Sequence, residues 1–388
     1  MVGGLYGGEL MAEKVAIVGV KEYKPAEAYP DTFYTQIIVD TVMPLLEEMN
    51  MPWEEMESLV AAGCDMQDGR SISNVFTVDA MGGFMKEESK VEEDMAVALI
   101  YAYMRVASGR FQTCLVCGYG KGSELHPHYF TGLQSEPVFM KPMGLDGLST
   151  SALQATAYMS KYGISREAGA AMAALDLRNA LKDPNAQRAM DVSVDEVLRS
   201  RELAYPITEL EYVPVSDGCV AVMLASGEVA SKYADKPVWI EGIGNCNDLF
   251  YPGHRDLADT RCVKAAAERA YKMAGVGAAD IQLAEVYGYS SWQELMVLEG
   301  LGFAGDGGAP AALGAGKFNP GGELPVNTSG GALSANVWMA CGGARVAECF
   351  LQLRGEAGGR QVEGATRAVA HAVSGLALQS NTVIVLGR

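Results

Sequence analysis

The sequence predicts an α/β fold made of two similar halves. Short runs of β-branched and apolar residues alternate with longer stretches of helical periodicity along most of the 388 residues, a pattern typical of sheets covered by helices. The order strand, helix, strand, helix, strand (βαβαβ) occurs twice, with a seam near residues 229–237. Because parallel strands need a crossover such as a helix, two layers of largely parallel sheet are expected. The simplest account is an internal duplication, with an N-terminal half at residues 13–230 and a C-terminal half at residues 236–388.

The N-terminal half is expected to begin and end with a strand. Its elements, in chain order, are the strand Lys14–Val20, the helix Tyr34–Met49, the strand Ser58–Cys64, the helix Glu93–Gly109, the strand Thr113–Gly120, the helices Ser151–Ser165 and Arg166–Leu181, and the strand Ser216–Ser226. Residues from about 120 to about 210 are expected to form a loop insertion in this half. The stretch before Glu13 lacks a charged segment followed by an apolar one, so we expect a loose tail and no signal peptide.

The C-terminal half repeats the alternation. Its elements are the strand Ser231–Gly244, the helix Cys262–Gly275, the strand Ala284–Gly288, a helix within Ser290–Phe303, the helix Gly342–Gly355, and final strands at Arg367–Gly375 and Asn381–Arg388. A glycine-rich stretch at Asn319–Ser334 contains neither GxGxxG nor GxxxxGK[ST]. Binding of nucleotide phosphates by such a loop is therefore not indicated.

The composition argues against several classes of partner. A net charge of −18 repels polyanions, so neither nucleic acid nor an anionic membrane is an expected partner. No run of 18 apolar residues is present, so no membrane-spanning helix is expected. The eight cysteines include Cys114 and Cys117, but strand alternation places these two on opposite faces, where joint metal binding is not expected. We therefore expect no metal in this chain, and buried thiols in a reducing cytoplasm.

Five segments carry a resemblance to a known family. They are YMSKYGISREAGA, PVSDGCVAVMLAS, EVYGYSSWQELMVLEGLGF, LPVNTSGGALS and FLQLRGEAGGRQVEGA. In their order and spacing the chain resembles the thiolase superfamily, in the branch that works with a small OB-fold/zinc-ribbon partner subunit. That branch includes thiolase-like acyl-CoA enzymes and steroid side-chain retro-aldolases. The resemblance implies a five-layered αβαβα fold, a homodimer core, and coenzyme A bound in a tunnel as substrate or product.

The first departure from the family concerns the nucleophile. Thiolases carry a cysteine at the start of a buried helix, where the helix dipole and free N–H groups favour a thiolate. Alignment of the predicted helix places Glu92 at about the position of that cysteine, and no cysteine occurs between Cys64 and Cys114. A carboxylate there is either a helix cap or, buried beside an acyl-CoA, an acid or base with a raised pKa.

The second departure is Tyr287. Relatives carry histidine or asparagine at this strand-to-helix corner, where it helps to hold the thioester oxygen, whereas the retro-aldolase branch has a tyrosine. A tyrosine hydroxyl donates one hydrogen bond and, when ionised, accepts a proton. The alternative is an ordinary Tyr-x-Tyr pair packed under the helix. Tyr287 is therefore a candidate oxyanion donor or base.

The third departure lies after the glycine-rich turn. The family's Gly-His-Pro triplet is absent, and ungapped counting puts Val337 in place of its histidine. Cys341, four residues on at a predicted helix start, is either a substitute nucleophile or a buried structural thiol. His371 aligns with the loop in which relatives place a last site residue, and is a further candidate.

Two other groups have an implied or open role. The turn residues Asn327, Ser329, Gly330 and Gly331 belong to the loop by which the family shapes the acyl pocket, and they are our candidates for contact with CoA. His126 and His128 are either a metal pair or part of a loop at the substrate entrance. No third ligand of suitable spacing is visible, which favours the entrance loop.

The expected function is C–C bond chemistry next to the CoA thioester of a bulky acyl chain, aryl or steroid-like. Thiolysis requires a cysteine that takes the acyl group before CoA removes it, whereas retro-aldol cleavage needs only a proton acceptor and an oxyanion donor. The missing cysteine and Tyr287 favour the second reaction, and the family's commonest activity favours the first. The third alternative is a catalytically silent subunit that binds acyl-CoA and supports an active partner.

Overall fold

The computed structural model describes residues 13–388, so the predicted N-terminal tail lies outside the described residues. A nine-stranded sheet crosses the molecule in the order β3–β2–β4–β7–β1–β8–β11–β10–β9. Its strands are β1 Val15–Ala26, β2 Ser58–Ala62, β3 Glu87–Val91, β4 Thr113–Lys121, β7 Asp217–Ser226, β8 Val238–Asn247, β9 Leu283–Glu285, β10 Arg367–Ser374 and β11 Ser380–Gly387. Only two residue pairs, Ala16–Trp239 and Ile17–Val238, join the strands of the two halves.

The prediction of largely parallel sheets is wrong. Only the pairs β2–β3, β2–β4 and β9–β10 are parallel. Strand β7 runs antiparallel to both β4 and β1, and β11 runs antiparallel to both β8 and β10. A short turn joins β10 to β11, and the long insertion returns the chain from β4 to β7, so neither link is a simple helical crossover.

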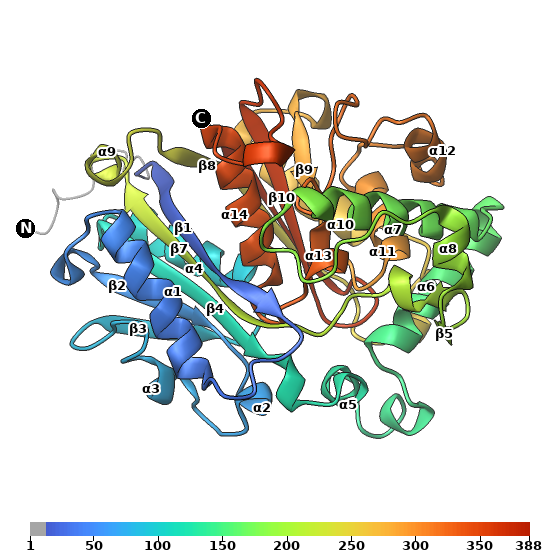
Figure 1. The fold of residues 1–388 in the computed structure, drawn as a ribbon, viewed down its shortest axis with the longest axis horizontal. Helices are drawn as coiled ribbons and strands as arrows, with labels where there is room; N and C mark the ends of the chain where they lie inside the picture. Colours follow the sequence, from blue (N-terminus) through green and yellow to red (C-terminus); the bar gives the residue numbers. More distant parts are fainter. Residues whose placement is uncertain (1–12) are drawn as a thin grey trace, which may run out of the picture.

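Four long helices complete the five predicted layers. They are α1 Tyr34–Glu48, α4 Met95–Ala107, α10 Arg261–Ala274 and α14 Cys341–Arg354. Helix α1 packs on one side of the N-terminal strands and α4 on the other, while α14 lies between α4 and β10 (Figure 1). Helix α10 covers β8 and β11. The layers are therefore α1, the N-terminal strands of the sheet, α4 with α14, the C-terminal strands of the sheet, and α10. This order confirms the αβαβα arrangement.

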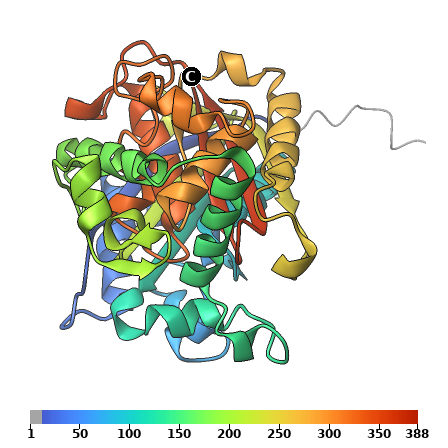
Figure 2. The same cartoon turned by 90° about the vertical axis from the view of Figure 1, so that its right-hand side faces the viewer.

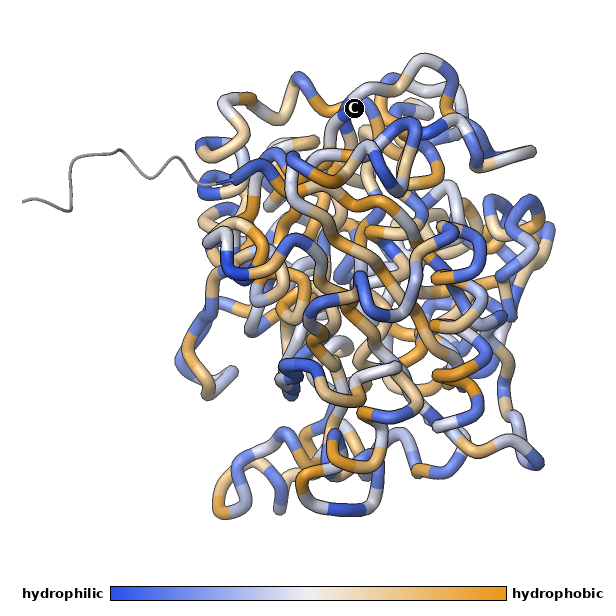
Figure 3. The backbone as a smooth tube through the Cα atoms, turned by 90° about the vertical axis from the view of Figure 1, so that its left-hand side faces the viewer, coloured by the Kyte–Doolittle hydropathy of each residue, from blue (hydrophilic) through white to orange (hydrophobic). Residues whose placement is uncertain are grey.

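Strand alternation divides the core as expected. On β4, Leu115 and Cys117 pack in the cluster under α1, whereas Cys114 and Val116 face the cluster that contains α4. The two cysteines therefore lie on opposite faces, as predicted. Figure 3 shows apolar residues concentrated in the middle of the molecule. None of the helices in residues 13–388 has the length and apolar character needed to cross a membrane.

Glycine sets the spacing between α10 and the sheet. A Cβ atom at Gly242 or Gly244 of β8 would lie 2.1 or 1.8 Å from the carbonyl oxygen of Ala270 or Ala266 on α10. No larger side chain fits there, so these two positions allow the helix backbone to lie directly on the strand. This contact fixes the outermost layer of the C-terminal half.

The remaining elements lie mostly in connections. They are α2 Asp65–Asp68, α3 Asn74–Thr77, α5 Pro127–Gly132, α6 Gly147–Tyr162, α7 Glu167–Asn179, α8 Val194–Arg199, β5 Glu202–Ala204, β6 Ile207–Thr208, α9 Ala230–Tyr233, α11 Ser291–Gly300, α12 Ala309–Gly314 and α13 Gly331–Ser334. The insertion helices α6 and α7 pack against α11 (Figure 2).

Two strand predictions need correction. The strand expected from Ser231 starts only at Val238, because residues 230–233 form α9. The strand expected to reach Gly288 ends at Glu285. The chain therefore leaves the sheet just before Tyr287, which places this side chain at the end of the sheet.

Candidate active site

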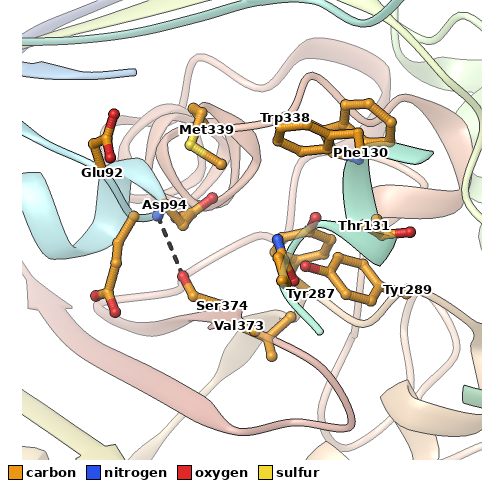
Figure 4. Close-up of a pocket in the computed structure, with 13 residues that line it drawn as sticks. Glu92, Asp94, Phe130, Thr131, Tyr287, Tyr289, Trp338, Met339, Val373 and Ser374 are labelled. Carbon is orange, nitrogen blue, oxygen red and sulfur yellow. Dashed lines mark hydrogen bonds between the residues drawn. The ribbon is translucent and has the colours of Figure 1, made fainter. Parts of the chain in front are cut away.

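A pocket of about 180 Å³ lies where the N-termini of α4 and α14 meet the ends of β9 and β10 (Figure 4). Five segments of the chain contribute its walls. The lining residues are Glu92, Glu93, Asp94, Phe130, Thr131, Gln134, Tyr287, Tyr289, Trp338, Met339, Val373, Ser374 and Gly375. We call this space the reaction pocket. It contains Tyr287 and Glu92 from the candidates named above, but neither Cys341 nor His371.

Asp94 caps two helices at once. Its Oδ1 accepts a hydrogen bond from the N–H of Ala96 in α4, and its Oδ2 accepts one from the N–H of Gly342 in α14, both at 2.9 Å. Both contacts place the carboxylate at positive helix ends, which favours its charge. The backbone N–H of Asp94 donates to Ser374 Oγ at 3.2 Å (Figure 4). Gly342 is required here, since a Cβ would lie 2.0 Å from Asp94 Oδ1.

Burial nevertheless governs the protonation of Asp94. The residue is 4 % exposed, and desolvation raises its pKa to about 7 against the opposing effect of the two N–H donors. A carboxyl group with this pKa exists in both forms near neutral pH. Asp94 therefore meets the requirement for a general base that later returns its proton.

Glu92 has a different environment. Its side chain is 51 % exposed, its Oε1 accepts the N–H of Asp65 at 2.7 Å, and it lies 3.2 Å from Lys90 Nζ. The helix cap is Asp94, two residues later. Sequence alignment therefore selected the right turn of the chain but not its most deeply buried carboxylate. The signal for Asp94 was its place directly before the apolar helical run, where aspartate is a preferred N-cap.

Tyr287 stands opposite Asp94 in the reaction pocket (Figure 4). Asn327 Oδ1 accepts the N–H of Val286 at 2.8 Å, which fixes the corner after β9. The ring of Tyr287 packs edge-on against Tyr289, with centroids 5.6 Å apart. Burial raises the pKa of Tyr287 well above its ordinary value, and the nearby Tyr289, Cys341 and Asp94 raise it further. The hydroxyl is therefore neutral, and of its two predicted roles the donor role fits the environment.

Cys341 is the first residue of α14, but it lines a separate small cavity together with Glu22 and Arg345. It is 1 % exposed. Burial raises its pKa far above the ordinary value, although the guanidinium of Arg345 acts in the opposite direction. A buried neutral thiol is a poor nucleophile. Among residues 13–388, no cysteine lines the reaction pocket.

We expect Cys341→Ala to leave turnover per folded molecule unchanged. The thiol is protonated and lies outside the reaction pocket, so its removal deletes only a packing contact. The measurement is kcat on protein whose folded fraction has been determined by circular dichroism. A loss of about tenfold or more in kcat, with the fold intact, would return Cys341 to the list of nucleophiles.

His371 lies within β10 and not in the loop where it was expected. Its Nε2 is 3.1 Å from Asn381 Oδ1, and burial lowers its pKa to about 4 although Asn381 and the backbone of Tyr287 favour the charged form. The imidazole is therefore neutral and sits behind the site. The residues of this strand end that line the reaction pocket are Val373, Ser374 and Gly375, which the sequence analysis did not select.

The turn Asn327–Gly331 makes internal contacts. Asn327 Nδ2 donates to Asp176 Oδ2 at 3.0 Å. Ser329 Oγ donates to Glu285 Oε2 at 2.6 Å and accepts from Arg345 at 2.8 Å. Gly330 and Gly331 both have positive φ. The buried network anchors the strand end below Tyr287, and a role of these four residues in binding CoA stays a prediction.

A second pocket of about 160 Å³ adjoins the first and shares Thr131, Tyr289 and Trp338 with it. We call it the side pocket. Its other lining residues are Pro127, His128, Arg201, Leu203, Tyr212, Val213, Pro214 and Val215. His128 pairs with Asp146, and no group of three or more potential metal ligands occurs among residues 13–388. Because His128 lines the side pocket, its position agrees with the interpretation of this segment as a loop at the substrate entrance.

Comparison with known proteins agrees with this architecture. Residues 250–388 match the profile of the family described as thiolase C-terminal domain-like. The chain is 30 % identical to an acetyl-CoA acetyltransferase of Methanothermobacter thermautotrophicus over 93 % of this chain and 96 % of that protein. It is 29 % identical to the benzoylsuccinyl-CoA thiolase subunit BbsB of Thauera aromatica, over 60 % and 61 % of the two chains.

Among solved structures, the chain resembles the Ltp2-ChsH2(DUF35) aldolase, with a TM-score of 0.83, 22 % identity, and coverage of 97 % of this chain and 98 % of that one. At this identity the likeness concerns the fold. The sequence match to the acetyltransferase extends over nearly the whole of both chains, and the five-layered architecture agrees with it. This chain belongs to the thiolase superfamily.

Proposed function

We propose that this protein cleaves a β-hydroxyacyl-CoA by a retro-aldol reaction, and forms the same bond in reverse. One observation carries the proposal: the group at the N-termini of α4 and α14 is the carboxylate of Asp94, and its pKa is raised. Tyr287 faces it with a neutral hydroxyl. A base and an oxyanion donor are what the reaction requires, and no covalent intermediate is needed.

The proposed steps balance without a co-reactant. Asp94 takes the proton of the β-hydroxyl, the β-carbon becomes a carbonyl, and the Cα–Cβ bond breaks with its electron pair moving to Cα. The resulting thioester enolate is held by the hydroxyl of Tyr287, and Cα then receives a proton from Asp94. The products are a ketone or aldehyde and a shortened acyl-CoA.

Coenzyme A is proposed to reach the reaction pocket through the side pocket. The reaction pocket carries the acidic side chains Glu92, Glu93 and Asp94, which repel phosphates. The side pocket instead carries His128 and Arg201. The charged end of CoA is therefore favoured on that side, with the thioester directed inward.

A bulky acyl chain, aryl or steroid-like, remains part of the proposal, and so does location in a reducing cytoplasm. The similarity to a benzoylsuccinyl-CoA thiolase subunit supports an aryl substituent, and the eight unpaired cysteines suit a reducing compartment. The fold likeness to an aldolase solved together with ChsH2(DUF35) supports a small OB-fold/zinc-ribbon partner subunit.

The test offers purified protein two acyl-CoA classes and identifies the products by mass spectrometry. A β-hydroxyacyl-CoA with a tertiary β-carbon should yield a ketone and a shortened acyl-CoA without added free CoA. A β-ketoacyl-CoA with free CoA should yield no thiolysis. Thiolysis is the second candidate, which the acetyltransferase relative favours, and its products would overturn the proposal. Binding of both compounds without turnover would indicate the silent-subunit alternative.

A homodimer core is also proposed. Large apolar side chains are exposed beside the edge strand β3, which in residues 13–388 pairs only with β2. They are Met66, Ile72, Val75, Phe76, Phe84 and Met85. An exposed apolar patch next to an open strand edge is typical of a protein interface. A second copy of this chain would cover both.

We expect light scattering to give twice the chain mass of 41.2 kDa. Met85→Glu, at a side chain that is 86 % exposed, should shift the protein toward monomer, because the interface would bury an unpaired charge. Phe139→Glu, at a similarly exposed position in the insertion, is the matched control and should stay dimeric. A monomeric wild-type protein would exclude this interface.

A further inference from the structure

The partition between the two pockets is built from three side chains. Thr131, Tyr289 and Trp338 are the residues that line both the reaction pocket and the side pocket. Trp338 contributes the largest of them, and it is 6 % exposed. Its ring stacks on Phe130 with centroids 4.5 Å apart and planes 23° apart. A ligand that spans both pockets has to pass this partition.

CoA thioesters are such ligands under the proposed function, on which this inference rests. The reacting carbons must lie beside Asp94 and Tyr287, while the phosphates are repelled by the acidic lining there. The basic side chains of the side pocket are His128 and Arg201, each next to one acidic neighbour, Asp146 and Glu209 respectively. The pantetheine arm, which links the phosphates to the thioester, must therefore cross between the two spaces.

The backbone under Trp338 is fixed. Met339 O accepts the N–H of Met95 at the start of α4 at 2.8 Å, and Met339 has a φ of 70°, a conformation that non-glycine residues adopt only under constraint. The carbonyl oxygen of Trp338 lies against β4, 2.7 Å from where a Cβ of Gly120 would be. Movement at this point is therefore movement of the indole ring and not of the chain.

The other two partition residues are held by hydrogen bonds of their own. Thr131 Oγ1 donates to Pro127 O at 3.1 Å. Tyr289 is held by its backbone on both sides, because its N–H donates to Gln293 Oε1 at 2.7 Å and its carbonyl accepts the N–H of Val213 at 3.1 Å. The ring of Trp338 is held instead by its stacking on Phe130. A side-chain rotation that breaks this stacking opens the partition.

We propose that Trp338 is a gate between the side pocket and the reaction pocket. Its indole rests on Phe130 in the free protein and turns away when the pantetheine arm of CoA, free or acylated, enters. In this position it also determines which substrates react, because an arm that cannot displace the ring does not bring its acyl group to Asp94. Trp338 is thus a positioning residue that selects for CoA thioesters.

The test uses tryptophan fluorescence, since the chain has only four tryptophans. Free CoA is titrated into wild-type protein, Trp338→Phe and Trp239→Phe, and binding is measured in parallel by calorimetry. Trp239 lies on β8 away from both pockets and is the matched control. We expect a saturable emission change in the wild type and the control. Trp338→Phe should bind CoA and lose the larger part of the change.

Three results would overturn the gate alone. They are CoA binding to the wild type without any emission change, a full emission change that persists in Trp338→Phe, and loss of CoA binding in Trp338→Phe, which would make the indole a binding group. Failure of the wild-type protein to bind CoA by calorimetry is a different outcome. It would overturn the proposed function, and the gate with it.

Discussion

Asp94→Asn is expected to lower turnover by about 10² to 10⁴, the usual contribution of a general base. The amide is nearly isosteric with the carboxylate but cannot accept a proton. One of its two polar ends must face an N–H of Ala96 or Gly342 with an NH₂ group, so some loss of capping, of about 1 kcal/mol, accompanies the change. Turnover must therefore be normalised to the folded fraction.

The matched control is Glu92→Gln, the same chemical change two residues away in the same pocket. Glu92 is half-exposed and pairs with Lys90, so kcat should change by less than about threefold. The opposite pattern, a tenfold or greater loss in Glu92→Gln with Asp94→Asn near wild type, would show that the sequence alignment had selected the right residue and that our assignment is wrong.

The pH dependence of kcat/KM tests the same residue without mutation. A base must be deprotonated to act, and burial raises the pKa of Asp94 to about 7. We therefore expect kcat/KM to rise with pH up to about 7 and then level, and this limb should be lost in Asp94→Asn. A profile that is flat between about pH 5 and 8 in the wild type would exclude Asp94 as the base.

Tyr287→Phe is expected to lower kcat by about a hundredfold or more, since the loss of one oxyanion donor costs about 2.7–4 kcal/mol. The ring keeps its packing against Tyr289, so the folded fraction should change little. In the wild type the hydroxyl acts in its neutral form, because burial raises the pKa of Tyr287.

Tyr289→Phe provides the comparison, because Tyr289 lines the same pocket and is likewise buried. We expect it to affect kcat less than Tyr287→Phe does. Undiminished kcat in Tyr287→Phe would mean that the corner after β9 is scaffold. Another group would then have to hold the enolate oxygen, and the assignment of Tyr287 as the oxyanion donor would be wrong.

The local features of this fold were predicted well from the sequence. Helices α1, α4, α10 and α14 begin and end within two residues of their predicted limits, because periodicity and capping are local properties. Strand direction was not predictable in this way, since it depends on how the insertion returns the chain to β7. The strand β3 was missed because its sequence, EESKV, is charged and only partly buried.

The site residues also divide into those that the local sequence predicts and those that depend on long-range contacts. Tyr287 could be found from its place between a strand and a helix. The role of Asp94 depends on its contact with Gly342, 248 positions along the chain, which no local pattern encodes. His371 lies inside the final strand that the sequence predicted, so it was the alignment with the relatives' loop, and not the strand limits, that misplaced it. Contacts of this range arise from the packing of α4 against α14 and are visible only in the folded chain.

The central claim is that the C–C bond is cleaved by acid–base chemistry without a covalent acyl-enzyme. The most direct measurement is the intact mass of the wild-type protein, quenched during turnover of a β-hydroxyacyl-CoA whose products are followed in the same sample. We predict steady formation of ketone and shortened acyl-CoA with the protein mass unchanged. An acyl adduct that forms and decays at the rate of turnover would contradict the account and indicate covalent, thiolase-like chemistry.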